Sequence, residues 1–123
     1  MAYLPKINNS PCRTITTPFD DLVLRLRTYW LGDVSGVWKM DVSNADGTAI
    51  ASAVSLVHGI ENLIAGLGYT PLDGYQFRMA KGPSFNGTSV SSLGVTEKLV
   101  IFQPGESEEQ KAYVLARVLA GEV

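Results

Sequence analysis

The feature that most constrains this chain is the alternation of apolar and polar residues in short runs that end at turn residues. In the segment Asp21–Thr28, Leu22, Leu24 and Leu26 alternate with other residues. In Gly36–Ser43, the alternate positions are Trp38, Met40 and Val42. Because successive side chains of a β-strand point to opposite faces, this spacing predicts half-buried strands rather than helices.

A hairpin is expected where the second run ends in Asn44–Gly47. An Asp-Gly pair after an alternating run favours a tight turn, because Gly47 adopts a positive φ at little cost. We therefore expect a return strand over Thr48–His58, with small residues that leave room for Trp38. These small residues are Ala49, Ala51 and Ala53.

Two more strands are predicted nearer the C-terminus, Tyr75–Ala80 and Lys98–Phe102. Between them, Lys81–Ser92 is rich in Gly, Pro, Ser and Thr, which indicates a surface loop. The segment Gly59–Gly68 is short and bounded by glycine, so we expect only one or two helical turns at one end of the sheet.

The C-terminal segment has the pattern of a helix. Pro104 and Gly105 end the preceding strand, and Ser107–Gln110 is a capping-box pattern that begins a helix. An apolar stripe is expected to be buried on the sheet or on another chain, because a short isolated helix is marginal in water. The stripe comprises Ala112, Leu115, Ala116 and Leu119.

The chain of 123 residues has a length that suits one domain. We predict a mainly β fold, a small antiparallel barrel or sandwich with a short helical turn and a C-terminal helix. The domain divides into an N-terminal extension (1–13), a β core (14–103) and the C-terminal helix (106–121).

Charge and hydropathy argue against several classes of partner. The net charge is -2, so no positive field favours specific binding to a nucleic acid. No run approaches the ~18 apolar residues that a membrane helix needs, so we expect no membrane partner. Residues 1–9 do not resemble a secretory signal, which leads us to expect synthesis in the cytosol.

The residues that carry chemistry do not form a recognisable motif. The one imidazole, His58, and the one thiol, Cys12, could pair as base and nucleophile, but neither stands in a known signature. We expect His58 to be a hydrogen-bonded structural residue. The acidic cluster Glu106, Glu108 and Glu109 indicates a helix start rather than a metal site. We therefore predict no catalytic residue, cofactor or metal, and no enzyme activity.

An alternative function is that of a small β-barrel that binds single-stranded nucleic acid. Its aromatic side chains would stack on bases, and its arginines would contact phosphates. At this net charge, we favour the interpretation that most of the aromatic residues fill the core. The residues concerned are Tyr29, Trp30, Trp38, Tyr75 and Phe77, with Arg25, Arg27 and Arg78.

The order and spacing of four segments resemble the small baseplate plug proteins of tailed bacteriophages, a family typified by the baseplate plug of a cyanophage. The resemblance covers residues 14–103, and its segments are Phe19–Arg27, Val37–Ile50, Val54–Leu63 and Ser92–Phe102. The chain departs from the family in two longer connections, 29–35 and 81–91, and in the helix that follows Ser107.

The resemblance implies a structural, non-catalytic role in the virion, within the baseplate hub at the distal end of the tail tube. The implied partners are other baseplate, hub and tube proteins, and the implied place of assembly is the host cytoplasm. A tail also offers three-fold or six-fold symmetry for a homo-oligomer. We expect the helix and the Lys81–Ser92 loop to contact neighbouring chains through Leu115, Leu119, Tyr113 and Phe85.

Overall fold

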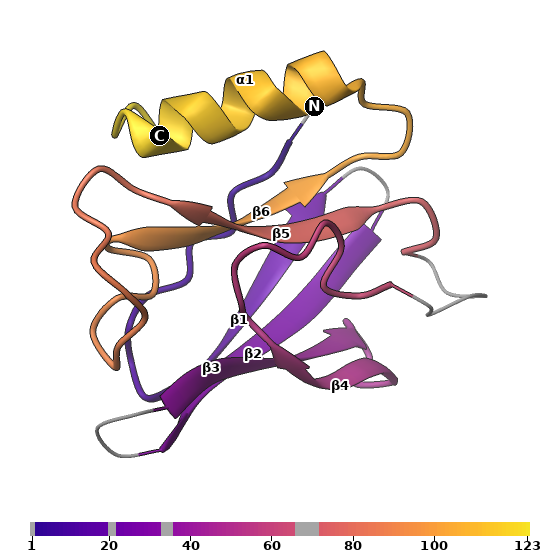
Figure 1. Cartoon of the computed structure of the whole chain (residues 1–123). Coiled ribbons are helices and arrows are strands. Elements are labelled where there is room, and N and C mark those ends of the chain that lie inside the picture. Colours follow the sequence, from indigo (N-terminus) through magenta and orange to yellow (C-terminus); the bar gives the residue numbers. More distant parts are fainter. Residues whose placement is uncertain (1, 20–21, 33–35, 66–71) are drawn as a thin grey trace.

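Two antiparallel sheets and one helix are stacked in three layers in the computed structural model of the chain (Figure 1). The structure describes residues 2–19, 22–32, 36–65 and 72–123. The four-stranded sheet has the order β1-β2-β3-β4 and comprises β1 (Cys12–Phe19), β2 (Leu22–Gly32), β3 (Gly36–Asn44) and β4 (Ala49–Ser55). The second sheet pairs β5 (Gln76–Lys81) with β6 (Glu97–Phe102), and α1 (Glu108–Leu119) covers its outer face.

This architecture confirms the predicted mainly β fold with a C-terminal helix. The described strands form two open, facing sheets, so the fold is a sandwich rather than a closed barrel. Leu24 and Leu26 of β2 and Trp38, Met40 and Val42 of β3 are buried between the sheets, as their alternation predicts. Asp21 lies outside the described residues.

The sequence alone does not predict β1. Its central positions are threonines, with Ile15 as the one aliphatic side chain among them, so no apolar alternation marks the strand. The structure nevertheless pairs β1 with β2 along its whole length, from Cys12 opposite Tyr29 to Phe19 opposite Leu22. The pairing is therefore imposed by β2 and not by the local pattern of β1.

The hairpin between β3 and β4 is confirmed. The Gly47 amide donates to the Asn44 carbonyl at 2.9 Å, and Gly47 has a φ of +92°. The Thr48 amide donates to Asp46 Oδ1 at 2.9 Å, and this hydrogen bond lowers the pKa of the Asp46 carboxyl. The backbone amides of the turn are thus hydrogen-bonded to groups of the turn itself.

Of the β4 alanines, Ala51 lies opposite Val42 and packs against the core cluster that contains Trp38. The expected contact with Trp38 is wrong for Ala49 and Ala53, which are exposed. The reason is a bulge at Ala53, which has a φ of +54° and donates its amide to Asp41 Oδ1 at 2.8 Å. The strand also ends at Ser55, before the predicted limit at His58.

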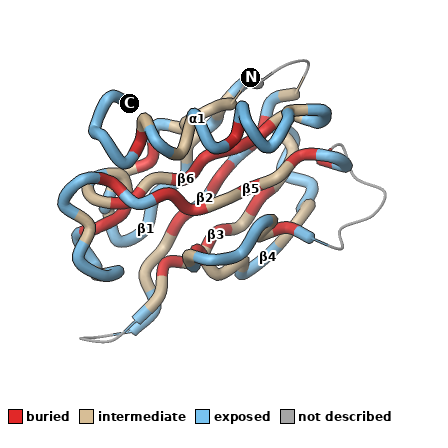
Figure 2. Tube along the Cα trace, turned by 45° about the horizontal axis from the view of Figure 1, so that its top comes forward, coloured by how far each residue is buried: buried red, intermediate tan, exposed pale blue. Residues whose placement is uncertain are grey.

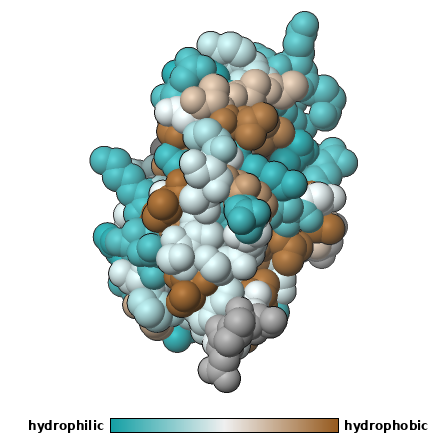
Figure 3. All heavy atoms as spheres, turned by 60° about the vertical axis from the view of Figure 1, so that its left-hand side comes forward, coloured by the Kyte–Doolittle hydropathy of each residue, from teal (hydrophilic) through white to brown (hydrophobic). Residues whose placement is uncertain are grey.

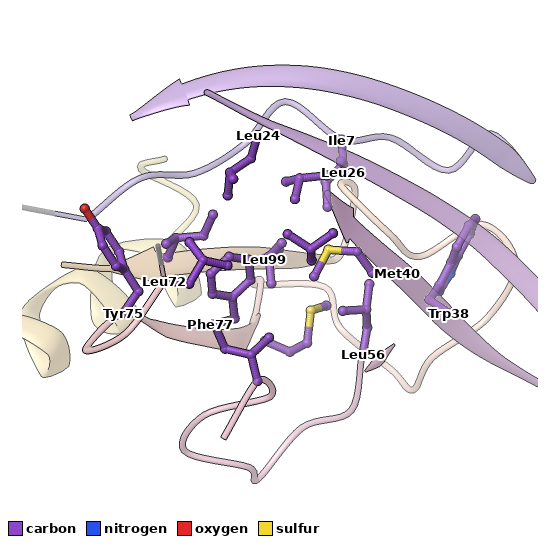
Figure 4. Packing of buried hydrophobic residues seen from close by; sticks show 14 of the residues in the cluster. Ile7, Leu24, Leu26, Trp38, Met40, Leu56, Leu72, Tyr75, Phe77 and Leu99 are labelled. Atoms are coloured by element: carbon purple, nitrogen blue, oxygen red, sulfur yellow. The ribbon is translucent and has the colours of Figure 1, made fainter. Parts of the chain in front are cut away.

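Within the second sheet, β6 is buried on both faces, and this explains its apolar sequence. Phe77 and Leu99 point toward β2 and β3 and fill the space below Leu24 and Leu26 (Figure 4). The alternate residues of β6, Val100 and Phe102, pack instead under α1. Figure 2 shows buried residues along β2, β3, β5 and β6.

The outer edge of β5 is covered by the segment in which helical turns are expected. Residues 59–65 form turns, with the Ala65 amide donating to the Asn62 carbonyl at 3.2 Å, and residues 66–68 lie outside the described part. Asn62 Oδ1 accepts the amide of Phe77 at 3.1 Å, and the Leu63 amide donates to the Phe77 carbonyl at 2.8 Å. The segment therefore occupies backbone groups of β5 that would otherwise be unpaired.

The start of α1 is confirmed. Ser107 accepts the Gln110 amide through Oγ at 3.1 Å, and Gln110 Oε1 accepts the Ser107 amide at 2.9 Å. This reciprocal pair is the capping box that the sequence predicts.

The predicted buried stripe of α1 is displaced around the helix axis. Val118 and the stem of Lys111 are buried, and Val114 and Leu115 are partly buried against the same cluster. Of the predicted stripe, only Leu115 contacts the core. The other three residues, Ala112, Ala116 and Leu119, are exposed.

Substitutions of Trp38 test the packing between the sheets. Its ring is fully buried, lies edge-on to Trp30 at 5.5 Å, and donates Nε1–H to the Ser89 carbonyl at 2.9 Å. Trp38→Ala should lower the free energy of unfolding by about 3–5 kcal/mol. Trp38→Phe retains an aromatic ring and should cost about 1–2 kcal/mol. Urea denaturation followed by circular dichroism measures both, and an alanine variant with the wild-type midpoint would contradict this packing.

Candidate functional site

A buried carboxylate, Glu97, collects polar side chains at the start of β6. Its side chain is 0% exposed. Glu97 Oε1 lies 2.9 Å from His58 Nε2 and 3.3 Å from Thr88 Oγ1, and Oε2 accepts the hydroxyl of Ser92. We call these four residues the Glu97 network.

The loop that precedes β6 is folded around Ser92. The Ser92 carbonyl accepts the amides of Val95, Thr96 and Glu97 at 3.0–3.2 Å, and its Oγ accepts the Ser89 amide at 3.0 Å. The Ser89 carbonyl in turn accepts Trp38 Nε1–H from β3. The Glu97 network therefore joins the loop to both sheets.

The order of groups in the network is not that of a hydrolase triad. In a triad, the serine hydroxyl donates to the imidazole, which donates to the acid. Here Glu97 lies between Ser92 and His58 and contacts both. Ser92 is also buried, with 3% of its surface exposed, which leaves no access for a substrate at its hydroxyl. The geometry supports a structural role in which the carboxylate holds three neighbours in place.

The pairing of Cys12 with His58 is not formed. Cys12 is exposed on β1 opposite Tyr29, whereas His58 contacts Glu97, and its ring centroid lies 4.6 Å from that of Phe85 with the two rings tilted by 51°. His58 is thus hydrogen-bonded, as expected of a structural histidine.

The predicted interface residues fall in two places. Tyr113 and Leu119 of α1 are 65% and 57% exposed, whereas Leu115 is partly buried on the core. Phe85 is partly buried between His58 and Lys81, whose Nζ lies 5.6 Å from the ring centroid. The structure therefore brings Phe85 to the Glu97 network and leaves the α1 residues on a separate surface.

The surface carries its apolar residues in separate patches. Figure 3 shows hydrophobic residues as islands between hydrophilic and near-neutral ones on one face of the molecule. Large exposed apolar side chains occur on several elements, and the most exposed of them is Tyr113. The others are Val23, Leu31, Val57, Ile60, Val90, Val95 and Leu119.

Three of the five aromatic residues named for the nucleic-acid alternative lie in the core. Trp38, Phe77 and Tyr75 are buried, so their ring faces are not open to bases. Arg27 pairs with Asp41 at 3.1 Å, and this hydrogen bond, followed by the electrostatic effect of Cys12, raises the pKa of the Arg27 guanidinium. The cation is thus already paired within the protein.

The part of the chain that the structure describes contains neither a cluster of metal ligands nor a membrane-spanning helix. Among those residues, no three His, Cys, Asp or Glu side chains lie close enough together to hold a metal ion. Over the same ranges, α1, with 12 residues, falls short of the length that a membrane-spanning helix needs.

Sequence reasoning missed Glu97, Ser92 and Thr88 as members of one network. The signal in the sequence is the acid itself, because Glu97 stands two residues before the apolar run Leu99–Phe102. An acidic residue beside such a strand is buried only where donors surround it. The serines and threonines of the preceding loop supply those donors.

No family model matches this chain, and neither does any curated protein.

A substitution of Glu97 tests whether the Glu97 network stabilises the protein. Glu97→Ala should lower the free energy of unfolding by about 2–4 kcal/mol, because it removes the acceptor shared by three side chains and leaves a cavity at a fully buried position. Glu61→Ala, which removes an exposed acid, is the matched control and should change stability by less than about 0.5 kcal/mol. Thermal and urea denaturation measure both variants. Equal stability of the two variants would show that Glu97 does not hold the loop.

Proposed function

We propose that the chain is a structural subunit of a tailed-phage baseplate, a plug or hub-lining protein that closes or completes the distal end of the tail tube. The proposal combines the resemblance of the sequence to baseplate plug proteins with the placement of polar and apolar side chains. Its partners would be other hub and tube proteins and further copies of the same chain.

One observation carries the proposal. The polar atoms of the Glu97 network bond to one another inside the protein, whereas Tyr113 and Leu119 remain more than half exposed on α1. Burying such side chains on a neighbour is favourable at roughly 25 cal/mol per Å² of apolar surface. The arrangement supports docking to other subunits more than it supports catalysis.

The positions of the two residues on α1 support contacts with more than one neighbour. At about 100° per residue, Tyr113 and Leu119 lie about 120° apart around the helix axis. The Arg117 guanidinium lies 5.8 Å from the Tyr113 ring centroid, and tyrosine and arginine are both enriched in interfaces. A subunit in a closed ring has a neighbour on each side, which fits two separate contact residues.

Removal of the chain from the particle tests the function. A tailed phage that carries this gene, with the gene deleted, should produce tails whose distal end is incomplete, and the gene supplied in trans should restore infectivity. Electron microscopy and plaque counts measure both results. Fully infectious particles with normal tails from the deletion strain would overturn the proposal.

Point variants on α1 test the contacts. Tyr113→Glu and Leu119→Glu, supplied in trans, should each lower the amount of the chain in purified tails at least tenfold while leaving its fold intact. Point variants are preferable to removal of α1, which would expose Val100 and Phe102. Ala45→Glu, on the exposed β3–β4 turn, is the control and should be incorporated as the wild type. Quantitative mass spectrometry of the tails measures incorporation, and wild-type amounts of both α1 variants would rule out these contacts.

A further inference from the structure

A groove lies between the N-terminal segment and the outer edge of β1. One wall is Leu4–Lys6, the other is Arg13–Pro18, and the hollow between them measures about 550 Å³. Figure 1 shows the N-terminal segment, in indigo, descending from the helix layer past β6 to the start of β1. We call this hollow the β1 groove.

The β1 edge that faces outward has free backbone groups. The Pro11 carbonyl accepts the Trp30 amide at 3.0 Å, so residues 11, 13, 15 and 17 direct their backbone groups toward β2. The alternate residues Thr14 and Thr16 then direct their amides and carbonyls outward. Within the described ranges, no hydrogen-bond partner is found for these outward groups.

Both edges of the second sheet are covered, in contrast to the β1 edge of the four-stranded sheet. Tyr3 and Ile101 exchange two backbone hydrogen bonds of 2.8 Å and so cover β6, and Asn62 and Leu63 cover β5. An uncovered strand edge is a ready template for another strand. The β1 edge is therefore suited to accept an extended peptide.

The β1 groove is positively charged. Lys6 and Arg13 are exposed in its walls, and neither forms an ion pair with any residue that the structure describes. A second hollow shares Leu4–Lys6 and Arg13 with the groove, and in it Lys98 Nζ donates to the Val123 carbonyl oxygen at 2.8 Å. Among the described residues that line the β1 groove, no side chain is acidic. In a chain of net charge -2, this is a local surface that favours negative charge.

The N-terminal wall of the groove is held in place on both sides. Tyr3 is paired with Ile101, and Ile7 is buried against Gly94. A Cβ at Gly94 would clash with the Ile7 carbonyl oxygen, and Gly94 has a φ of +76°. Asn9 Nδ2 also donates to the Ser91 carbonyl at 3.1 Å. A wall that is already ordered lowers the entropy cost of binding.

We propose that the β1 groove binds an extended segment of another protein that carries Asp or Glu side chains, and that this segment adds a fifth strand to the sheet beside β1. Backbone hydrogen bonds to Thr14 and Thr16 would supply affinity, and Lys6 and Arg13 would select the acidic side chains. A second copy pairing through the same edge is disfavoured, because it would bring the two sets of cations together. The inference does not depend on a role in a phage particle.

The test is a titration of the ¹⁵N-labelled full chain followed by NMR. The probe is a seven-residue peptide that alternates Glu with Val, capped at both ends. We expect the largest amide shifts at Thr14 and Thr16, and at least tenfold weaker binding of the same peptide with Lys in place of each Glu. A third peptide, N-methylated at alternate residues so that it cannot donate to β1, should also bind at least tenfold more weakly.

Charge variants complete the test. The double variant Lys6→Glu with Arg13→Glu should reverse the preference between the Glu and Lys peptides, whereas Arg117→Glu, the same kind of change on α1, should leave it unaltered. The proposal is overturned if the wild-type chain shows no shifts at millimolar Glu peptide, if the shifts lie away from β1, or if the Lys peptide binds equally well.

Discussion

The fold depends on β6 being buried on both faces. Leu99 and Ile101 pack toward the four-stranded sheet, and Val100 and Phe102 pack toward α1. A two-stranded sheet alone would be marginal in water, so each layer requires the others. The helix is therefore part of the core, and only its outer surface remains exposed. This constraint explains why Val118 is buried while Tyr113 is not.

The same strand explains the polar chemistry of the molecule. Glu97 stands at the start of β6, where burial would be costly for an unpaired carboxylate. The Glu97 carboxylate forms hydrogen bonds with His58, Thr88 and Ser92, and these bonds attach the loop before β6 to the sandwich. The groups that could have formed a reactive site thus stabilise the connection between the sheets.

The sequence predicts the strands and the helix that bury one face and expose the other. Leu24, Leu26 and the alternating residues of β3 mark their strands, and Ser107 marks the start of α1, because each of these signals is local. β1 is not predicted, because its pairing is dictated by β2. The register of β4 is not predicted either, because the bulge at Ala53 depends on a hydrogen bond to Asp41 from the neighbouring strand.

The candidate site was less predictable than the fold for the same reason. The exposure of Tyr113 and Leu119 depends on which face of α1 meets β6, and a stripe of alanine and leucine does not fix that face. The Glu97 network joins residues up to 39 positions apart in the sequence, and the β1 groove joins the N-terminal segment to a strand edge. Both arise only when the sheets are stacked.

The central claim is that this chain acts by occupying a place in an assembly. The most direct measurement is a cryo-electron microscopy map of the tail of a phage that encodes it. The account predicts density for the sandwich at the distal end of the tail tube, with α1 against neighbouring subunits. Particles that lack the chain, or a map that places it in the head, would contradict the account.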